Sequence, residues 1–162
     1  MELHRAKELA LELMNLHGLL DGKSPWAFKW RKSRNAAGTC RFRTKEIMLS
    51  LYLTPFCDDA DVKDTILHEI AHALTPGDGH GYAWQRKARE IGSIGMRFYG
   101  MDGKKQSLVN ANKLVSKFKA VCKNGHESYS NRLSKKRKSC GLCSNKFNPN
   151  ELLVFLPNSI TN

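Results

Sequence analysis

The sequence has little of what secreted and membrane proteins need. Charges interrupt its first 20 residues every few positions, and no later stretch approaches the ~18 apolar residues of a membrane span. Its five cysteines are an odd number, and three of them fall between positions 122 and 143, which is not the spacing of a disulfide framework. Cys40 and Cys57 are expected to be ordinary apolar side chains. We therefore expect a soluble, cytoplasmic protein with no membrane partner, whose clustered thiols bind metal.

Acidic residues are scarce in the last third of the chain. Residues 1–103 carry 15 Lys/Arg and 13 Asp/Glu, a balance of +2, whereas residues 104–162 carry 12 and 2, a balance of +10. A cationic block beside a near-neutral region is typical of proteins with polyanionic partners, because neutralised phosphates release condensed counterions. We therefore expect two domains, 1–103 and 104–162, of which the second binds nucleic acid.

Hydrophobic spacing predicts an α+β fold for the first domain. Apolar residues recur at helical spacing near the N-terminus, and "WAFKW" alternates like a strand with its aromatics on one face. Turn-forming residues separate the later runs. The expected elements are a helix over 3–17, strands over 26–30, 39–43 and 46–53, and helices over 57–75 and 82–92. These runs indicate a small three-stranded sheet with three helices.

The helix expected over 57–75 contains "HEIAH", which fits the HExxH pattern. At about 100° per residue, it places Val62, Ile66, Ile70 and Ala73 on one side and Asp61, Thr65, His68 and His72 on the other. Imidazoles at positions i and i+4 can converge on one tetrahedral ion, while Glu69 between them is held near the attacking water rather than on the metal. The pattern therefore predicts a zinc site on this helix.

Two residues are candidates for the third ligand. Pro76 and the glycines of "TPGDGHG" end the helix and let the chain reverse, which can bring His80 back towards the first two histidines. Glu90 stands at about the spacing of a glutamate ligand, but its helix also needs a charged outer face. The metzincin spacing is excluded, because Thr75 and Asp78 occupy its Gly and His positions. We favour His80, which would leave a fourth position open, as in catalytic zinc sites.

A second metal-ligand pattern lies in the basic domain. Cys140 and Cys143 form a C-x-x-C pair, and Cys122 with His126 can supply the opposing half of a Cys₃His zinc site. That half is C-x₃-H rather than the commoner C-x₂-C of zinc ribbons. Three short β-like runs are expected around the pair, at 119–122, 128–130 and 152–155. A redox-active C-x-x-C is the alternative, but these runs do not resemble a thioredoxin βαβ unit. The pattern favours a zinc-ribbon-like module that depends on its metal.

A cationic stretch, "RLSKKRK", runs between the two ligand pairs. The residues expected to contact phosphates are Arg132, Lys135, Lys136, Arg137 and Lys138. Tyr129 and Phe147 flank this stretch, and each suits either stacking on unpaired bases or packing within a small ribbon. We therefore expect DNA as the partner, in single-stranded or junction-containing form.

The motifs together resemble one family. "HEIAHAL" followed by "GHGYAW" and preceded by "EIMLSLYL" is similar to the SprT-like family, whose better known eukaryotic members are the Spartan proteases. The resemblance implies a zincin-like minimal metalloprotease domain followed by a C-terminal zinc-binding segment. It implies that His68, His72 and His80 hold a catalytic zinc, in addition to one structural zinc, and that Glu69 is the general base. It also implies DNA-dependent cleavage of DNA-bound or DNA-crosslinked proteins.

One alternative function is a non-catalytic zinc-containing protein that binds DNA or regulates other proteins. A purely structural zinc site would need no carboxylate at the position of Glu69, so this residue favours the enzyme. We expect a monomer.

Overall fold

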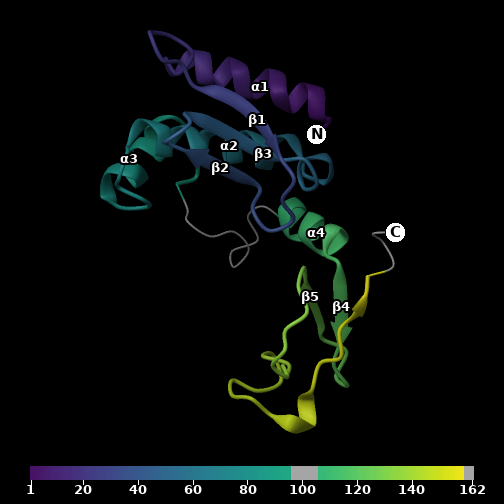
Figure 1. Ribbon diagram of the computed structural model, residues 1–162. Helices are drawn as coiled ribbons and strands as arrows, with labels where there is room; N and C mark the ends of the chain where they lie inside the picture. The colour runs from purple at the N-terminus through teal and green to yellow at the C-terminus, as the bar shows by residue number, and fades with distance from the viewer. Residues whose placement is uncertain (96–105, 159–162) are drawn as a thin grey trace. The chain divides into compact units, whose positions relative to one another are not determined.

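The computed structural model describes residues 1–95 and 106–158 (Figure 1). The chain divides into two units, Met1–Ala111 and Asn112–Asn162, so the division falls within helix α4 (Gln106–Val115). The domain boundary expected at residue 103 lies outside the described residues. Both units contain a small sheet, and the molecule is α+β, as expected from the sequence.

A three-stranded sheet supports the N-terminal unit. Its strands are β1 (Ala27–Arg31), β2 (Gly38–Arg41) and β3 (Glu46–Ser50), in the order β1-β3-β2. The central strand β3 is parallel to β1 and antiparallel to β2. The register pairs Phe28 with Ile47 and Trp30 with Leu49, so the half-buried aromatics of β1 share a face with two buried core residues. The alternation in the sequence therefore marked the core face of this strand.

Three helices accompany the sheet in this unit. They are α1 (Leu3–Leu16), α2 (Asp59–Leu74) and α3 (Tyr82–Glu90). Helix α2 packs against α1, α3, β2 and β3, and is the central element of the unit. No helix among the described residues is both long enough and apolar enough to cross a membrane.

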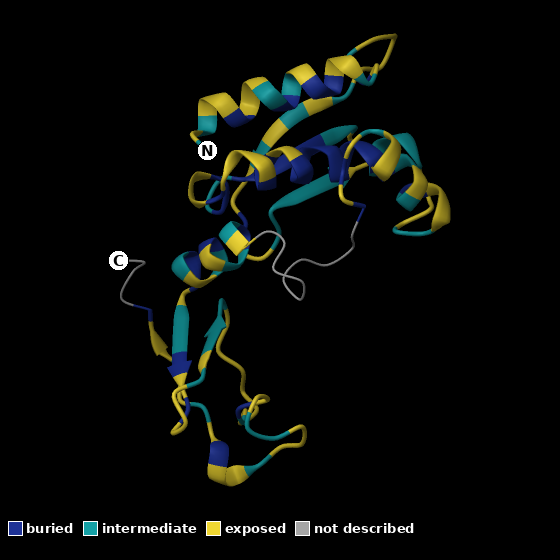
Figure 2. Ribbon diagram, turned by 180° about the vertical axis from the view of Figure 1, so that it is seen from behind, coloured by how far each residue is buried: buried dark blue, intermediate teal, exposed yellow. Residues whose placement is uncertain are grey.

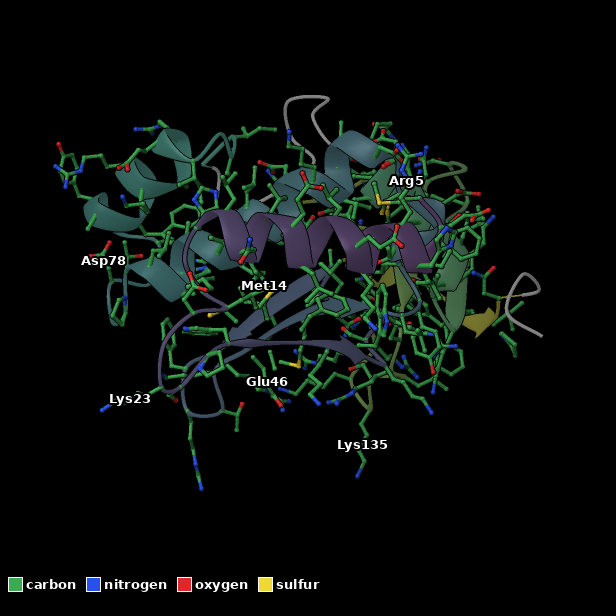
Figure 3. The ribbon with its side chains drawn as sticks, turned by 90° about the horizontal axis from the view of Figure 1, so that it is seen from above. Arg5, Met14, Lys23, Glu46, Asp78 and Lys135 are labelled. Atoms are coloured by element: carbon green, nitrogen blue, oxygen red, sulfur yellow. The ribbon has the colours of Figure 1, made fainter. Side chains whose placement is uncertain are left out.

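Helix α2 is buried on nearly every side. From residue 61 to residue 71 only Lys63 is exposed, and Figure 2 shows this stretch in dark blue. The expected stripe of Val62, Ile66 and Ile70 is buried, but the opposite side of the helix, which carries His68, is buried as well. The reason is tertiary: the sheet, α1 and α3 together enclose the helix.

Aspartates fix the N-terminal half of α2. Oδ1 of Asp58 accepts the N–H of Asp61 at 2.8 Å and caps the helix. One turn further on, Oδ1 of Asp64 accepts the N–H of Ile94 at 2.7 Å. The first bond fixes the start of the helix, and the second attaches the helix to a later loop, upstream of the histidines.

The C-terminal unit contains a second three-stranded sheet. Its strands are β4 (Phe118–Val121), β5 (Glu127–Ser130) and β6 (Leu156–Pro157), in the antiparallel order β5-β4-β6. The strand expected at 152–155 is not formed. Leu152 makes an isolated bridge with Ser139, and the N–H of Leu153 donates to the carbonyl of Lys138 at 2.9 Å. This segment therefore bonds to the chain before Cys140, and pairing with β4 starts only at β6.

Candidate metal centres

Three histidines converge in the N-terminal unit. His68 and His72 extend from α2 one turn apart, and His80 comes from the loop before α3. Nε2 of His80 lies 3.1 Å from Nε2 of His68 and 3.1 Å from Nε2 of His72. Nitrogens bound to a tetrahedral zinc ion are separated by about 3.3–3.4 Å, given bonds of about 2.0–2.1 Å. The three imidazoles are therefore arranged so that they could hold one metal ion.

Glu90, the other candidate for the third ligand, does not join this group. Its carboxylate accepts a hydrogen bond from Nζ of Lys87 at 2.6 Å, and its side chain is largely exposed on α3. The charged outer face that the sequence predicted for α3 accounts for this residue.

The charge state of His72 suits a metal ligand. Burial, reinforced by the charge of His80, lowers the pKa of His72 to about 4, although a backbone hydrogen bond at Gly79 acts in the opposite direction. The imidazole is therefore neutral at pH 7, which is the form that binds metals.

Trp84 contacts all three imidazoles, although no motif in the sequence had singled it out as part of the site. Its ring centroid lies 4.7 Å from that of His68, 5.2 Å from that of His72 and 4.5 Å from that of His80. Its side chain is completely buried and packs with Ala71 and Ala88. The available signal in the sequence was an aromatic residue four positions after His80, on the inner face of the next helix.

Glu69 is buried beside strand β2. A Cβ atom added to Gly38 would lie 2.7 Å from Oε1 of Glu69 and 2.9 Å from Cγ2 of Thr65, so only glycine allows this close approach. Cys40, two residues along the same strand, has a pKa raised to about 12 by burial and by the charge of Glu69. Burial likewise raises the pKa of Cys57 to about 11. Both thiols are therefore neutral at pH 7, in keeping with the apolar roles expected of them.

The profile of the SprT-like family matches residues 11–104, which is more than half of the chain and includes all three histidines. The chain belongs to the SprT-like family. This confirms the resemblance that the motifs indicated, and it supports a metalloprotease function.

This SprT-like chain also has a distant structural likeness to a solved protein structure. It is similar to the crystal structure of the metallopeptidase zymogen of Methanocaldococcus jannaschii jannalysin, with 15% sequence identity and a TM-score of 0.47. The similarity covers 65% of this chain and 91% of the archaeal one. The search of curated proteins gave no match.

The C-terminal unit of the SprT-like chain contains the second cluster. Its members are Cys122, His126, Cys140 and Cys143. Sγ of Cys122 lies 3.7 Å from Sγ of Cys143, and Nδ1 of His126 lies 3.2–3.7 Å from the three sulfurs. Ligands of a tetrahedral zinc ion are separated by about 3.8 Å for two sulfurs and about 3.5 Å for sulfur and nitrogen. All five cysteines are free thiols, so this cluster could hold a metal ion through four ligands.

Backbone hydrogen bonds shape both halves of this cluster. The N–H of Cys122 donates to the carbonyl of His126 at 3.0 Å, across a turn in which Gly125 has a φ of 80°. On the other side, the N–H of Cys143 donates to the carbonyl of Cys140 at 3.2 Å, and Nδ2 of Asn124 donates to Sγ of Cys143 at 3.2 Å. Each pair of ligands is thus held by its own turn.

The five cations expected to contact phosphates lie together in the sequence of this unit and are all exposed. They are Arg132, Lys135, Lys136, Arg137 and Lys138. The last of them, Lys138, lines a groove of about 420 Å³ together with Lys146, three aromatic residues and several small polar residues. Phe147 is 59% exposed in this groove, and Nζ of Lys138 lies 5.7 Å from the ring centroid of Phe155. Lys138, at the end of the cationic stretch, therefore lies beside accessible aromatic rings.

Proposed function

We propose that this SprT-like chain is a zinc-dependent endopeptidase that cleaves DNA-bound or DNA-crosslinked proteins and is brought to DNA by its C-terminal unit. The observation that carries the proposal is the convergence of three imidazoles next to a buried glutamate. Family membership supports the peptidase activity. Zinc is the metal that this donor set favours, because three imidazoles with an open fourth position are typical of catalytic zinc sites.

The histidines and Glu69 have different roles in the proposed reaction. His68, His72 and His80 would hold the zinc ion, which supplies Lewis-acid polarisation of the scissile carbonyl and of water. Glu69 accepts the proton of the attacking water and passes it to the leaving amine. The close contact of its side chain with Gly38 restricts the carboxylate to few orientations, which favours a fixed position of the accepting oxygen.

Targeting to DNA rests on the charge and shape of the C-terminal unit. Its exposed cations would neutralise phosphates, and this contact carries no sequence information. The groove that contains Phe147 and Phe155 has room for an unpaired base, and stacking on aromatic rings tolerates any base. These features favour single-stranded or junction-containing DNA over a specific duplex sequence.

The decisive experiment uses the full chain and a protein crosslinked to single-stranded DNA. Glu69→Gln should lower the rate of cleavage by about 10²- to 10⁴-fold, because the general base is lost. The variant should still bind two zinc ions, because no ligand is changed. Glu90→Gln is the matched control, since it alters an exposed acid of the same unit, and its rate should equal that of the wild type.

Two outcomes would contradict the proposal. Equal cleavage by Glu69→Gln and the wild type would remove Glu69 from the mechanism. A wild-type chain that binds DNA and two zinc ions, yet cleaves no DNA-bound protein, would favour the non-catalytic alternative.

A further inference from the structure

The third histidine of the site lies on a loop rich in glycine, which is a poor support for a metal ligand. Gly77 and Gly79 have φ values of 85° and 60°, a region that glycine adopts without strain and that leaves the free loop many conformations. His68 and His72, in contrast, are fixed by the buried helix α2. Residues other than the three histidines must therefore keep His80 close to His68 and His72.

We propose that Asp78 and Trp84 are positioning residues that hold His80 at the metal site before the metal binds. The inference rests on the proposed function in one respect, namely that the three histidines bind zinc. Neither residue is a ligand, and each acts through the histidines that it supports.

Trp84 forms a common support for the three ligands. Its indole is stacked on His72 at an interplanar angle of 28° and meets His68 and His80 at 66° and 76°. Since the indole is completely buried against Ala71 of α2 and Ala88 of α3, it cannot move without disturbing both helices. One rigid ring therefore sets the distance of the loop histidine from the two helix histidines.

Asp78 ties the loop to the helix that carries Trp84. Its Oδ2 accepts the backbone N–H of Trp84 at 2.7 Å, and its own carbonyl accepts the N–H of Gly81 at 2.9 Å. A Cβ at Gly81 would lie only 2.7 Å from Oδ1 of Asp78. A side chain at this position would therefore collide with the carboxylate in the place where it bonds to Trp84. The carboxylate thus caps α3 from three residues before its N-cap, where a negative charge complements the helix dipole.

His80 lies inside this closed segment. It is flanked by Gly79 and Gly81, and its carbonyl accepts a hydrogen bond from Nε2 of Gln85 at 3.1 Å. The bond between Asp78 and Trp84 spans the histidine, so the loop cannot open without breaking it. A ligand held in this way loses little further freedom when it meets the metal, which raises the affinity of the site.

The test measures metal affinity in the full chain, with the thiolate cluster as an internal reference. Cobalt can replace zinc in both clusters, and thiolate-bound cobalt has a charge-transfer absorption that imidazole-bound cobalt lacks, so the two sites titrate separately. Asp78→Ala should weaken the histidine site by about 10- to 100-fold, the usual cost of losing an outer support of a ligand. The thiolate site should be unchanged. Asp78 is exposed, so this variant leaves the core intact.

Conservative variants separate positioning from general stability. Asp78→Asn keeps an oxygen that can accept the N–H of Trp84 and should restore most of the affinity. Trp84→Phe keeps a ring against the imidazoles and should retain more affinity than Trp84→Leu. Asp58→Ala is the matched control, because it removes the aspartate cap of α2, ten positions before His68, and leaves the loop of His80 unchanged.

The outcomes are distinct. A wild-type chain whose histidines bind no metal would overturn the proposed function together with this inference. If the wild type binds metal there and Asp78→Ala and Trp84→Leu bind it equally tightly, the inference alone is wrong. It is also wrong if Asp58→Ala weakens the site as much as Asp78→Ala does, because the effect would then come from lower stability.

Discussion

The two units differ in what their cores are made of. In the described part of the C-terminal unit, the buried apolar side chains are Val115, Ala120, Cys122 and Cys140. The core of the N-terminal unit extends through α1, β3, α2 and α3, and it includes the large side chains of Met14, Ile47, Ile66 and Trp84. Two of the four side chains named for the C-terminal unit, Cys122 and Cys140, are candidate metal ligands, whereas none of the buried apolar side chains described in the N-terminal unit is one.

This difference indicates that folding and metal binding depend on each other in opposite ways in the two units. In the N-terminal unit, packing of α2 and Trp84 places the histidines, so the site is a product of a fold that stands without it. A unit with so few buried apolar groups gains little from the hydrophobic effect, so a metal ion held by its cysteines would supply much of its folding free energy. In the N-terminal unit the metal site would therefore depend on the fold, whereas in the C-terminal unit the fold would depend on the metal.

Removal of metal should separate the two units most strongly. A structural zinc ion contributes about 10–16 kcal/mol to the folding of small zinc modules, far more than the few buried side chains here could replace. Chelation of the full chain should therefore abolish amide protection in β4 and β5 while α2 remains protected. Hydrogen exchange followed by mass spectrometry measures both in one sample.

Single substitutions reproduce this contrast without a chelator. Cys140→Ser should have the same effect on β4 and β5 as chelation, whereas Cys57→Ser, which alters a buried thiol outside the cluster, should leave them protected. Protection of β4 and β5 in a metal-free chain would show that the contrast between the units is wrong.

The second prediction concerns the approach of β2 to the proposed base. Gly38→Ala should lower kcat by about 10²-fold, because the new Cβ displaces the carboxylate of Glu69 and such misplacement is costly for catalysis. Metal content and DNA affinity should stay at their wild-type values. Gly141→Ala is the control, since a Cβ there meets no atom within 4 Å. An unchanged kcat would mean that the close approach does not position Glu69.

The smallest expected effect concerns the cations of the C-terminal unit. Replacing residues 135–138 by glutamine should reduce the slope of log K against log salt for single-stranded DNA by about 3, because each phosphate contact contributes about 0.7–0.9. Cleavage of a DNA-free peptide should be unchanged. Replacement of Arg31, Lys32 and Arg34 in the other unit is the comparison. If those substitutions lower the slope instead, DNA binds to the N-terminal unit.

Much of the arrangement could be predicted from the sequence, because local spacing determines it. The alternation around Trp30 marked β1, and the spacing of His68 and His72 put both on one side of a helix. The glycines around His80 indicated a reversal of the chain. In each case the relevant partners lie within about a dozen residues, where the periods of helices and strands and the chemistry of turns are decisive.

The remaining features depend on contacts between segments that are distant in sequence. Gly38 is 31 positions before Glu69, and only the pairing of β2 with β3 under α2 brings the two together. The sequence predicted that α2 is buried along one apolar stripe, but its other side is buried as well, because α3 packs against it. The run at 152–155 had the composition of a strand, but its bonds to Lys138 and Ser139 keep it out of the sheet.

The contact of Trp84 with three imidazoles also has an optical consequence. An ion such as Cu²⁺ or Co²⁺, which quenches fluorescence over short distances, would lie beside this indole when held by His68, His72 and His80. The other tryptophans, Trp26 and Trp30, are half-buried at β1 and would contribute a steadier emission. The C-terminal unit has no tryptophan at all. The intrinsic fluorescence of the unlabelled chain would thus report, during a titration, the filling of the histidine site.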